Sequence, residues 1–207
     1  MITAELYASL ARMLDYPQEK KGLLSALGLV QGYLVAERLE CSLGPFGEFV
    51  TGSTLAEIQE EYVATFDFNP SVAPYLGHHL FGDNQKKGEY LIALKGEYRL
   101  HDYTPLGNEL PDHLPLILWF LAHLASKGET GARQAFIDRY VVPGVEKLAG
   151  SFAASRRDSP WRPVVEAIRL ICGEDAAQGV RPAEAIGHGV PEQSRPKMVM
   201  HPEVRPC

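Results

Sequence analysis

The apolar residues of this chain recur three or four positions apart along most of its length, which is the spacing of one face of an α-helix. No stretch of useful length alternates apolar and polar residues in the manner of a half-buried strand. The pattern therefore predicts an all-α protein of about six or seven helices in a single bundle. The predicted helices cover about residues 3–15, 18–41, 54–66, 84–103, 112–126, 130–156 and 160–172.

Local signals mark several of the predicted helix boundaries. Thr54 and Glu57 have the spacing of a capping box, in which each side chain bonds the backbone N–H of the other residue. Pro143 lies inside the predicted helix 130–156, where it removes one backbone donor and should kink the helix. The last helix opens on Ser159 and Pro160, and Gly173 is expected to close it.

Two segments between the helices are rich in proline and glycine. The Gly-Pro-Phe-Gly sequence of residues 44–47 is predicted to be a loop. Residues 67–82 carry Pro70, Pro74, Gly77 and Gly82 and are predicted to be an irregular connection. At roughly 16 residues this connection is long for a compact domain, and such loops are often functional.

The composition changes after Gly173. Residues 174–207 hold five prolines, several glycines and scattered charges, with too little apolar surface to offset the entropy of ordering them. The sequence thus predicts a helical domain over residues 1–173 and a flexible Pro/Gly-rich tail over residues 174–207.

Composition and charge narrow the class of protein. The 207 residues are 45% apolar with a net charge of −6, so this is a soluble globular chain with no basic field for nucleic acid or anionic lipid. Three widely spaced cysteines give neither a zinc pattern nor a disulfide framework. The first residues do not resemble a signal peptide, and no apolar run reaches the roughly 18 residues of a membrane helix. A cytoplasmic location without membrane insertion is expected.

Motifs of catalysis and metal binding are missing from the sequence. It contains no Glu-x-x-His, His-Glu-x-x-His or paired Cys-x-x-Cys, no nucleophile elbow, and no glycine-rich phosphate loop. We therefore predict no catalytic residues, no metal site and no cofactor. The alternative from another class is a helical-bundle enzyme or metal-binding protein that would use His78, His79, His113 and His123.

The segment from Asn108 to Leu124 combines polar chemistry with one of the most apolar stretches of the chain. If Asp112 is the N-cap, its carboxylate accepts from the Leu114 N–H, and Pro115 stands at the third helical position, where its missing donor costs little. His113 then occupies the first helical position. The same residues could equally present an acid and an imidazole to a ligand beside an apolar groove, and both roles can hold together.

Other aromatic and histidine residues of the long loop are not easily assigned to a core. Tyr75, His79 and Phe81 are therefore candidates for an apolar groove, together with Trp119 in the following apolar helix. The predicted peptide-binding residues are Glu109, Pro111, Asp112, His113, Tyr75, His79, Phe81 and Trp119.

Three motifs give the chain a resemblance to the NarJ/TorD/DmsD group of molybdoenzyme assembly chaperones, closest to the NarJ-like branch. Residues 61–67, Glu-Tyr-Val-Ala-Thr-Phe-Asp, resemble the end of the family's Tyr-x-x-x-Phe-Asp helix. Residues 79–88 resemble its loop-to-helix segment with a Gly-Asp pair. Residues 109–116, Glu-Leu-Pro-Asp-His-Leu-Pro-Leu, are similar to its most recognisable motif.

The resemblance implies an all-α fold and a non-enzymatic role. Members of the group bind the N-terminal or leader segment of the catalytic subunit of a molybdenum-cofactor oxidoreductase and support cofactor insertion. The Asp-His pair of the family motif, here Asp112 and His113, is associated with recognition of that leader. The expected partner is thus such a catalytic subunit, with nitrate reductase as one candidate, and the chaperone itself is expected to be a monomer or weak dimer. A structural subunit retained in the oxidoreductase is a further alternative.

Overall fold

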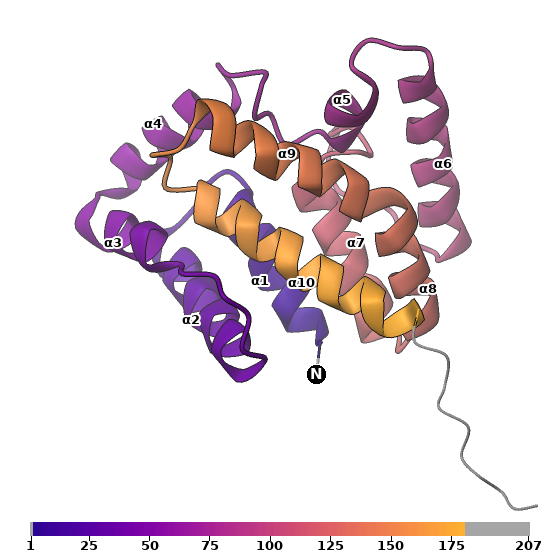
Figure 1. Ribbon diagram of the computed structural model, residues 1–207, viewed down its shortest axis with the longest axis horizontal. Coiled ribbons are helices and arrows are strands. Elements are labelled where there is room, and N and C mark those ends of the chain that lie inside the picture. Colours follow the sequence, from indigo (N-terminus) through magenta and orange to yellow (C-terminus); the bar gives the residue numbers. More distant parts are fainter. Residues whose placement is uncertain (1, 181–207) are drawn as a thin grey trace, which may run out of the picture.

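Helices form nearly all the regular structure of residues 2–180, the part of the chain that the computed structural model describes (Figure 1). The predicted all-α class is confirmed. In chain order the elements are α1 (Ala4–Leu14), α2 (Lys20–Ala36), α3 (Gly44–Gly52), α4 (Leu55–Phe66), α5 (Leu76–Phe81), α6 (Lys86–Leu100), α7 (Leu114–Ser126), α8 (Thr130–Phe136), a π-helical turn (Ile137–Val141), α9 (Val142–Ser155) and α10 (Arg162–Val180).

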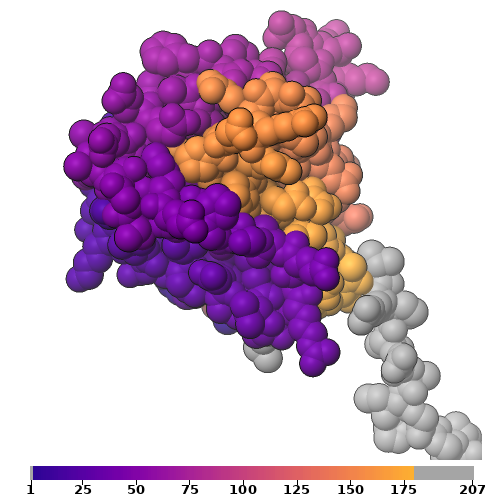
Figure 2. Space-filling model, turned by 60° about the vertical axis from the view of Figure 1, so that its left-hand side comes forward, coloured from indigo at the N-terminus to yellow at the C-terminus, as the bar shows by residue number. Residues whose placement is uncertain are grey.

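Helix α1 lies at the centre of the bundle, where it packs against α2, α7 and α10. Helix α9 lies along α10, and α5 packs against both α9 and α6. Figure 1 shows α5 and α6 on the opposite side of the molecule from α2 and α3. In Figure 2 the orange and yellow surface of α9 and α10 is bordered by the purple surface of the N-terminal helices.

The largest fully buried side chain is Trp161, just before α10. Its ring meets those of Phe46 and Phe49 in α3 and of Tyr62 and Phe66 in α4, with ring centroids 5.5–5.9 Å apart. Its Nε1–H donates to the carbonyl oxygen of Met13 at 3.0 Å, which satisfies the one polar atom of the indole. This aromatic cluster fixes the end of α4 against the end of α1.

Two predicted boundaries are confirmed in detail. Thr54 and Glu57 form the capping box of α4, with the Thr54 N–H donating to Glu57 Oε2 at 2.7 Å and the Glu57 N–H donating to Thr54 Oγ1 at 3.3 Å. The predicted helix 130–156 is interrupted as expected near Pro143. The proline occupies the first turn of α9, directly after the π-helical turn, where a missing N–H is tolerated.

Two predictions of irregular structure are wrong. Residues 44–47 begin α3, because Pro45 falls in the first turn, where proline is tolerated. Phe46 and Val50, four residues apart, are both buried and hold this helix on the core. The long connection 67–82 contains the short helix α5, whose first backbone N–H groups find partners outside the helix itself.

The prediction that Gly173 closes the last helix is also wrong, because α10 continues to Val180. The added turns carry Asp175, which is fully buried and accepts two hydrogen bonds from Arg133 at 2.6 and 3.0 Å. The Tyr7 hydroxyl donates to the same carboxylate at 2.6 Å. This network ties α10 to α1 and α8 and outweighs the weak helix propensity of glycine. The rest of the predicted tail, residues 181–207, lies outside the described residues.

Asp175→Ala is expected to lower the free energy of unfolding by about 3–5 kcal/mol, because it leaves the buried Arg133 guanidinium without its partner. Chemical denaturation measures this loss. The matched control is Glu166→Ala, which breaks a half-exposed pair with Arg169 on the same helix and should cost at most about 1 kcal/mol. Equal losses in the two variants would contradict the role assigned to Asp175.

Candidate functional site

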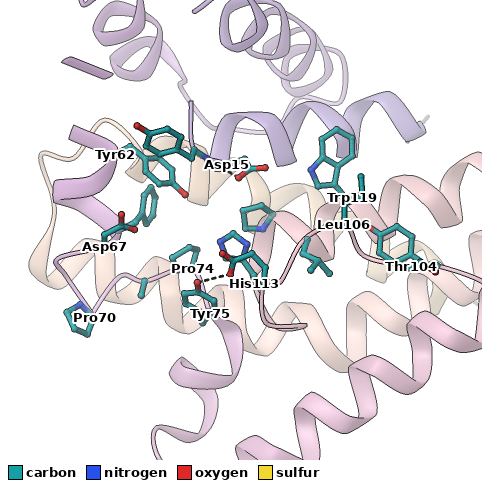
Figure 3. A pocket seen from close by; sticks show the side chains of 17 residues that line it. Asp15, Tyr62, Asp67, Pro70, Pro74, Tyr75, Thr104, Leu106, His113 and Trp119 are labelled. Atoms are coloured by element: carbon teal, nitrogen blue, oxygen red, sulfur yellow. Dashed lines mark hydrogen bonds between the residues drawn. The ribbon is translucent and has the colours of Figure 1, made fainter. Parts of the chain in front are cut away.

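A groove with a volume of about 1120 Å³ opens between the ends of α1 and α4, the start of α7 and the two loops that flank α5 and α6. In Figure 3 Asp15 and Trp119 lie along one side and Tyr75 and His113 along the other. Tyr62 and Asp67 lie toward one end, and Leu106 and Thr104 toward the opposite end. The lining residues are Asp15, Tyr16, Tyr62, Phe66, Asp67, Pro70, Ala73, Pro74, Tyr75, Tyr103, Thr104, Leu106, Glu109, His113, Pro115, Leu116 and Trp119.

The groove wall at Tyr75 and His113 is built by backbone pairing between two loops. An antiparallel β-bridge joins these two residues. Within it the Leu114 N–H donates to the Pro74 carbonyl at 2.7 Å, and the Leu76 N–H donates to the Asp112 carbonyl at 3.0 Å. The rings of Tyr75 and His113 consequently lie face to face, with centroids 5.0 Å apart and planes tilted by 33°.

The N-cap of α7 is His113, so the prediction that Asp112 caps this helix is wrong. The Leu114 N–H that was to bond the Asp112 carboxylate is taken by the Pro74 carbonyl. Asp112 Oδ2 instead accepts from the Gly77 N–H of α5 at 3.0 Å. Asp112 therefore caps the neighbouring helix α5, and Pro115 stands at the second position of α7.

Close packing around α5 requires glycine at two positions. A Cβ added to Gly77 would stand 2.8 Å from Asp112 Oδ2 and 3.2 Å from the Tyr90 ring. A Cβ added to Gly144 in α9 would stand 2.9 Å from Leu76 Cβ. Both distances are shorter than side chains tolerate, so these glycines allow α5 to sit between α9 and the start of α7.

Tyr75 is held in place at the groove wall by Glu109. The Tyr75 hydroxyl donates to Glu109 Oε2 at 3.0 Å. Burial and this hydrogen bond raise the pKa of Tyr75 to about 12, so the phenol stays protonated and keeps its role as donor. The bond orients both the ring and the carboxylate before any ligand arrives.

Carboxylates converge on the groove, and none of the described lining residues is a lysine or arginine. Burial lowers the pKa of the His113 imidazole, and this effect outweighs the attraction of four nearby carboxylates. Those carboxylates belong to Glu109, Asp15, Asp112 and Asp67. At neutral pH the groove therefore presents a neutral imidazole among acids, and its field attracts cations.

Four of the predicted site residues meet in this groove: Tyr75, Glu109, His113 and Trp119. The other four lie behind its wall. Asp112 is 0% exposed, and Pro111 is buried with its carbonyl accepting from the Tyr98 hydroxyl at 2.6 Å. His79 bonds the Ala73 carbonyl through Nε2 at 2.7 Å, and the Phe81 ring packs on that of Tyr90.

Several lining residues were missed from the sequence. Asp15 and Tyr16 follow α1, far from the other lining residues in the chain, and no local signal links them to residue 113. Tyr62 and Phe66 lie in the predicted helix 54–66, and both pack on Trp161 as well as lining the groove. Leu106 did carry a signal, since it is an apolar residue within a Pro-Leu-Gly turn.

Of the four histidines proposed for the metal-binding alternative, His78 and His79 are neighbours with ring centroids 5.5 Å apart, and no third ligand joins them in the described residues. Nε2 of His79 is hydrogen-bonded to the backbone carbonyl of Ala73, and Nε2 of His123 to that of His101. Within residues 2–180, no three histidine, cysteine or acidic side chains are grouped so that they could hold a metal ion. Nor does any helix in this part of the chain have the length and apolar character needed to cross a bilayer.

The fold and the groove define an all-α protein with an acidic, aromatic-walled groove. The chain belongs to the nitrate reductase delta subunit family, whose pattern matches residues 35–163. That match contains every lining residue of the groove except Asp15 and Tyr16. The resemblance drawn from the sequence motifs is thereby confirmed.

Several relatives to which the chain is similar are named as nitrate reductase molybdenum cofactor assembly chaperones. It is 29% identical over 151 residues to a probable nitrate reductase molybdenum cofactor assembly chaperone, NarJ, of Bacillus subtilis, covering 69% of this chain and 76% of that protein. It is 28% identical over 119 residues to the NarJ chaperone of Escherichia coli, covering 55% and 50% respectively. The probable NarW chaperone of Escherichia coli is 25% identical over 131 residues, covering 63% and 54%.

The buried Asp112 gives the site a testable pH dependence. Oδ1 of this carboxylate has no hydrogen-bond partner among the described residues, and burial raises the pKa of Asp112 despite the bond from the Gly77 N–H. A carboxyl whose folded pKa exceeds the unfolded value of about 3.9 stabilises the fold fully below that value, and this contribution declines as pH rises toward the folded pKa.

Asp112→Asn keeps an oxygen for the Gly77 N–H and removes the ionisation. We expect the free energy of unfolding of this variant, relative to the unaltered protein, to increase between about pH 3.5 and about pH 7. Urea denaturation at several pH values measures the difference, in which all other titrating groups cancel. A difference that stays constant across this range would contradict a raised Asp112 pKa.

Proposed function

We propose that this chain is an assembly chaperone that binds the N-terminal or leader segment of the catalytic subunit of a molybdenum oxidoreductase of the nitrate reductase type. The chaperone holds that segment in the groove while the molybdenum cofactor is inserted. The observation that carries this proposal is the groove itself, in which three acidic side chains and no described lysine or arginine surround an aromatic wall.

The size of the groove favours a peptide. Sites for small molecules commonly enclose about 300–1,000 Å³, whereas this groove has about 1120 Å³ and opens along several elements. A chain segment of several residues fits a space of this size and openness. The relatives' names, which describe cofactor assembly of nitrate reductase, support a client of the nitrate reductase type.

The chemistry of the lining favours a segment with an arginine beside apolar residues. The carboxylates of Asp15, Asp67 and Glu109 are exposed at the rim, where a guanidinium can reach them. Leu106, 93% exposed, supplies apolar surface at one end of the groove. The half-buried Trp119 supplies more along its side.

Rigid groove walls reduce the conformational entropy that is lost when the peptide binds. The Tyr75 ring is already fixed by its hydrogen bond to Glu109 and by the His113 ring. Asp112 acts through these residues as a positioning residue, since its carbonyl and carboxylate hold Leu76 and Gly77. A preorganised wall loses little side-chain freedom when the peptide docks.

The triple variant Asp15→Asn, Asp67→Asn and Glu109→Gln is expected to bind the client segment about tenfold more weakly or worse. Each exposed ion pair contributes about 0.2–1 kcal/mol, so the loss of three suffices for a factor of ten, which is about 1.4 kcal/mol. Titration calorimetry with a synthetic peptide of the catalytic subunit's N-terminal segment measures the dissociation constant.

The matched control replaces three exposed acids that do not line the groove, Glu48, Glu60 and Glu89, by glutamine. It makes the same change in net charge, so it separates the local field of the groove from the charge of the whole protein. We expect its dissociation constant to stay close to that of the unaltered protein. If both triple variants weakened peptide binding equally, the proposed binding site would be wrong.

Peptide binding is also expected to weaken on acidification, because His113 becomes charged. Since its pKa is lowered from the ordinary value of about 6.5, the imidazole is neutral near pH 7 and gains its proton only as the pH falls below that value. A cation there repels the arginine of the client. Between about pH 7 and about pH 5.5 the affinity should fall, and His113→Gln should flatten this dependence. Calorimetry at both pH values tests this, and an unchanged pH dependence in the variant would count against it.

A further inference from the structure

The groove has no cationic occupant among the described residues, although its chemistry demands one. Arg12 comes near, with its guanidinium 5.4 Å from the centre of the Trp119 ring, but it pairs with Glu5 at 2.7 Å and does not line the groove. At the rim, Leu106 is 93% exposed and Phe68, next to the lining residue Asp67, is 81% exposed. A ligand with cations followed by apolar side chains would neutralise the acids and cover these two residues.

One stretch of the chain beyond α10 has this composition. Residues 194–201 read Ser-Arg-Pro-Lys-Met-Val-Met-His, with Arg195 and Lys197 directly before three apolar side chains. No acid lies between Glu192 and Glu203. The other lysine or arginine residues of 181–207 are Arg181 and Arg205, neither of which has a second lysine or arginine within five residues.

The length of chain after α10 is sufficient to reach the groove. Asp175 of α10 bonds Tyr7 of α1, and α1 rises about 12 Å from Tyr7 to the groove residue Asp15. The 14 residues 181–194 can extend to at most about 46 Å. This extended length exceeds the distance from Val180 to Asp15, to which α1 contributes about 12 Å and the five residues from Asp175 to Val180 contribute about 8 Å.

We propose that residues 194–201 occupy the acidic groove of their own chain and that a client segment must displace them. This inference rests on the proposed function, since it assigns an autoinhibitory occupant to the same groove. Arg195 and Lys197 pair with the rim carboxylates, and the Met-Val-Met stretch lies over the apolar rim.

Tethering makes this self-occupancy effective even when the segment binds weakly. A short flexible linker gives an effective concentration in the millimolar range. A segment with an intrinsic dissociation constant of about 0.1 mM then fills the groove for most of the time and raises the apparent dissociation constant of a client about tenfold. Self-occupancy thereby covers the exposed acids and the apolar rim of the groove. Weakly binding partners are excluded, and a client segment that binds more tightly displaces residues 194–201.

The test uses the full chain with Arg195→Gln and Lys197→Gln together. The matched control is Arg181→Gln with Arg205→Gln, which removes the same charge outside the segment. Titration with the client's N-terminal peptide is expected to give an about tenfold lower dissociation constant in the first double variant and no change in the control. Equal affinity in all three proteins would overturn self-occupancy and leave the proposed function intact.

A second measurement needs no client. The chain has two tryptophans, Trp119 at the groove and Trp161 in the core, so a Trp119→Phe variant assigns the groove contribution to the emission. The Trp119 emission should differ between the unaltered protein and the Arg195/Lys197 variant, whether or not any client peptide binds. An identical Trp119 emission overturns the inference. A difference that disappears on dilution also overturns it, because the occupant would then come from a second copy.

The two proposals fail in distinguishable ways. If the client peptide binds no form of the protein while Trp119 still reports the segment, the proposed function fails and self-occupancy stands. A synthetic peptide of residues 192–203 gives the direct comparison: it should bind the Arg195/Lys197 variant, and the further change Glu109→Gln should weaken that binding. Binding that is indifferent to Glu109 would place the segment elsewhere on the surface and overturn the inference.

Discussion

The backbone pairing between residues 74–77 and 112–114 is the constraint on which the groove depends. The Leu114 N–H donates to Pro74, and the Leu76 and Gly77 N–H groups donate to the carbonyl and carboxylate of Asp112. The first backbone donors of two helices, α5 and α7, are thus satisfied by each other's entry segments and not by caps within each helix. The two helix starts are thereby locked together, and Tyr75 and His113 face each other as a consequence.

This backbone pairing buries the carboxylate of Asp112 in an otherwise apolar part of the protein. Asp112 is wholly buried, and one of its oxygens has no partner among residues 2–180. Such a group is unfavourable in isolation, and the packing around α5 has to offset it. Leu76 is fully buried against Gly144, and Gly77 fits beneath Tyr90. The tight packing of α5 and the burial of Asp112 are therefore linked through the bond from the Gly77 N–H.

Sequence periodicity was sufficient for the fold class and for most helices, because burial repeats every three to four residues on each of them. The capping box at Thr54 and Glu57 and the break at Pro143 were also readable, since both act within a few residues. Gly173 was misread because the Arg133–Asp175 pair, which holds the helix beyond it, spans 42 positions of sequence. Local propensity predicts an element only where no distant partner intervenes.

The contrast between local signals and distant partners also explains which residues of the candidate site could be predicted. Tyr75, Glu109, His113 and Trp119 were singled out because their polar and aromatic chemistry stands out locally, and all four line the groove. Asp112 was predicted to cap α7 and to face a ligand, whereas it is buried and bonds Gly77 of α5, which is 35 residues away in the sequence. The acids Asp15 and Asp67 follow helices that only tertiary packing brings to this place, so no local pattern could connect them to His113.

Helix α1 links the groove to the end of the described chain. Its C-terminal cap, Asp15, lines the groove, although the matched family region begins only at residue 35. Its Tyr7 bonds Asp175, which fixes the last turns of α10 beside the bundle. The direction in which the chain leaves α10 is thus set by the same helix that completes the acidic rim. Val180 lies about 8 Å along α10 from the Tyr7–Asp175 contact, and Asp15 lies about 12 Å along α1 from the same contact.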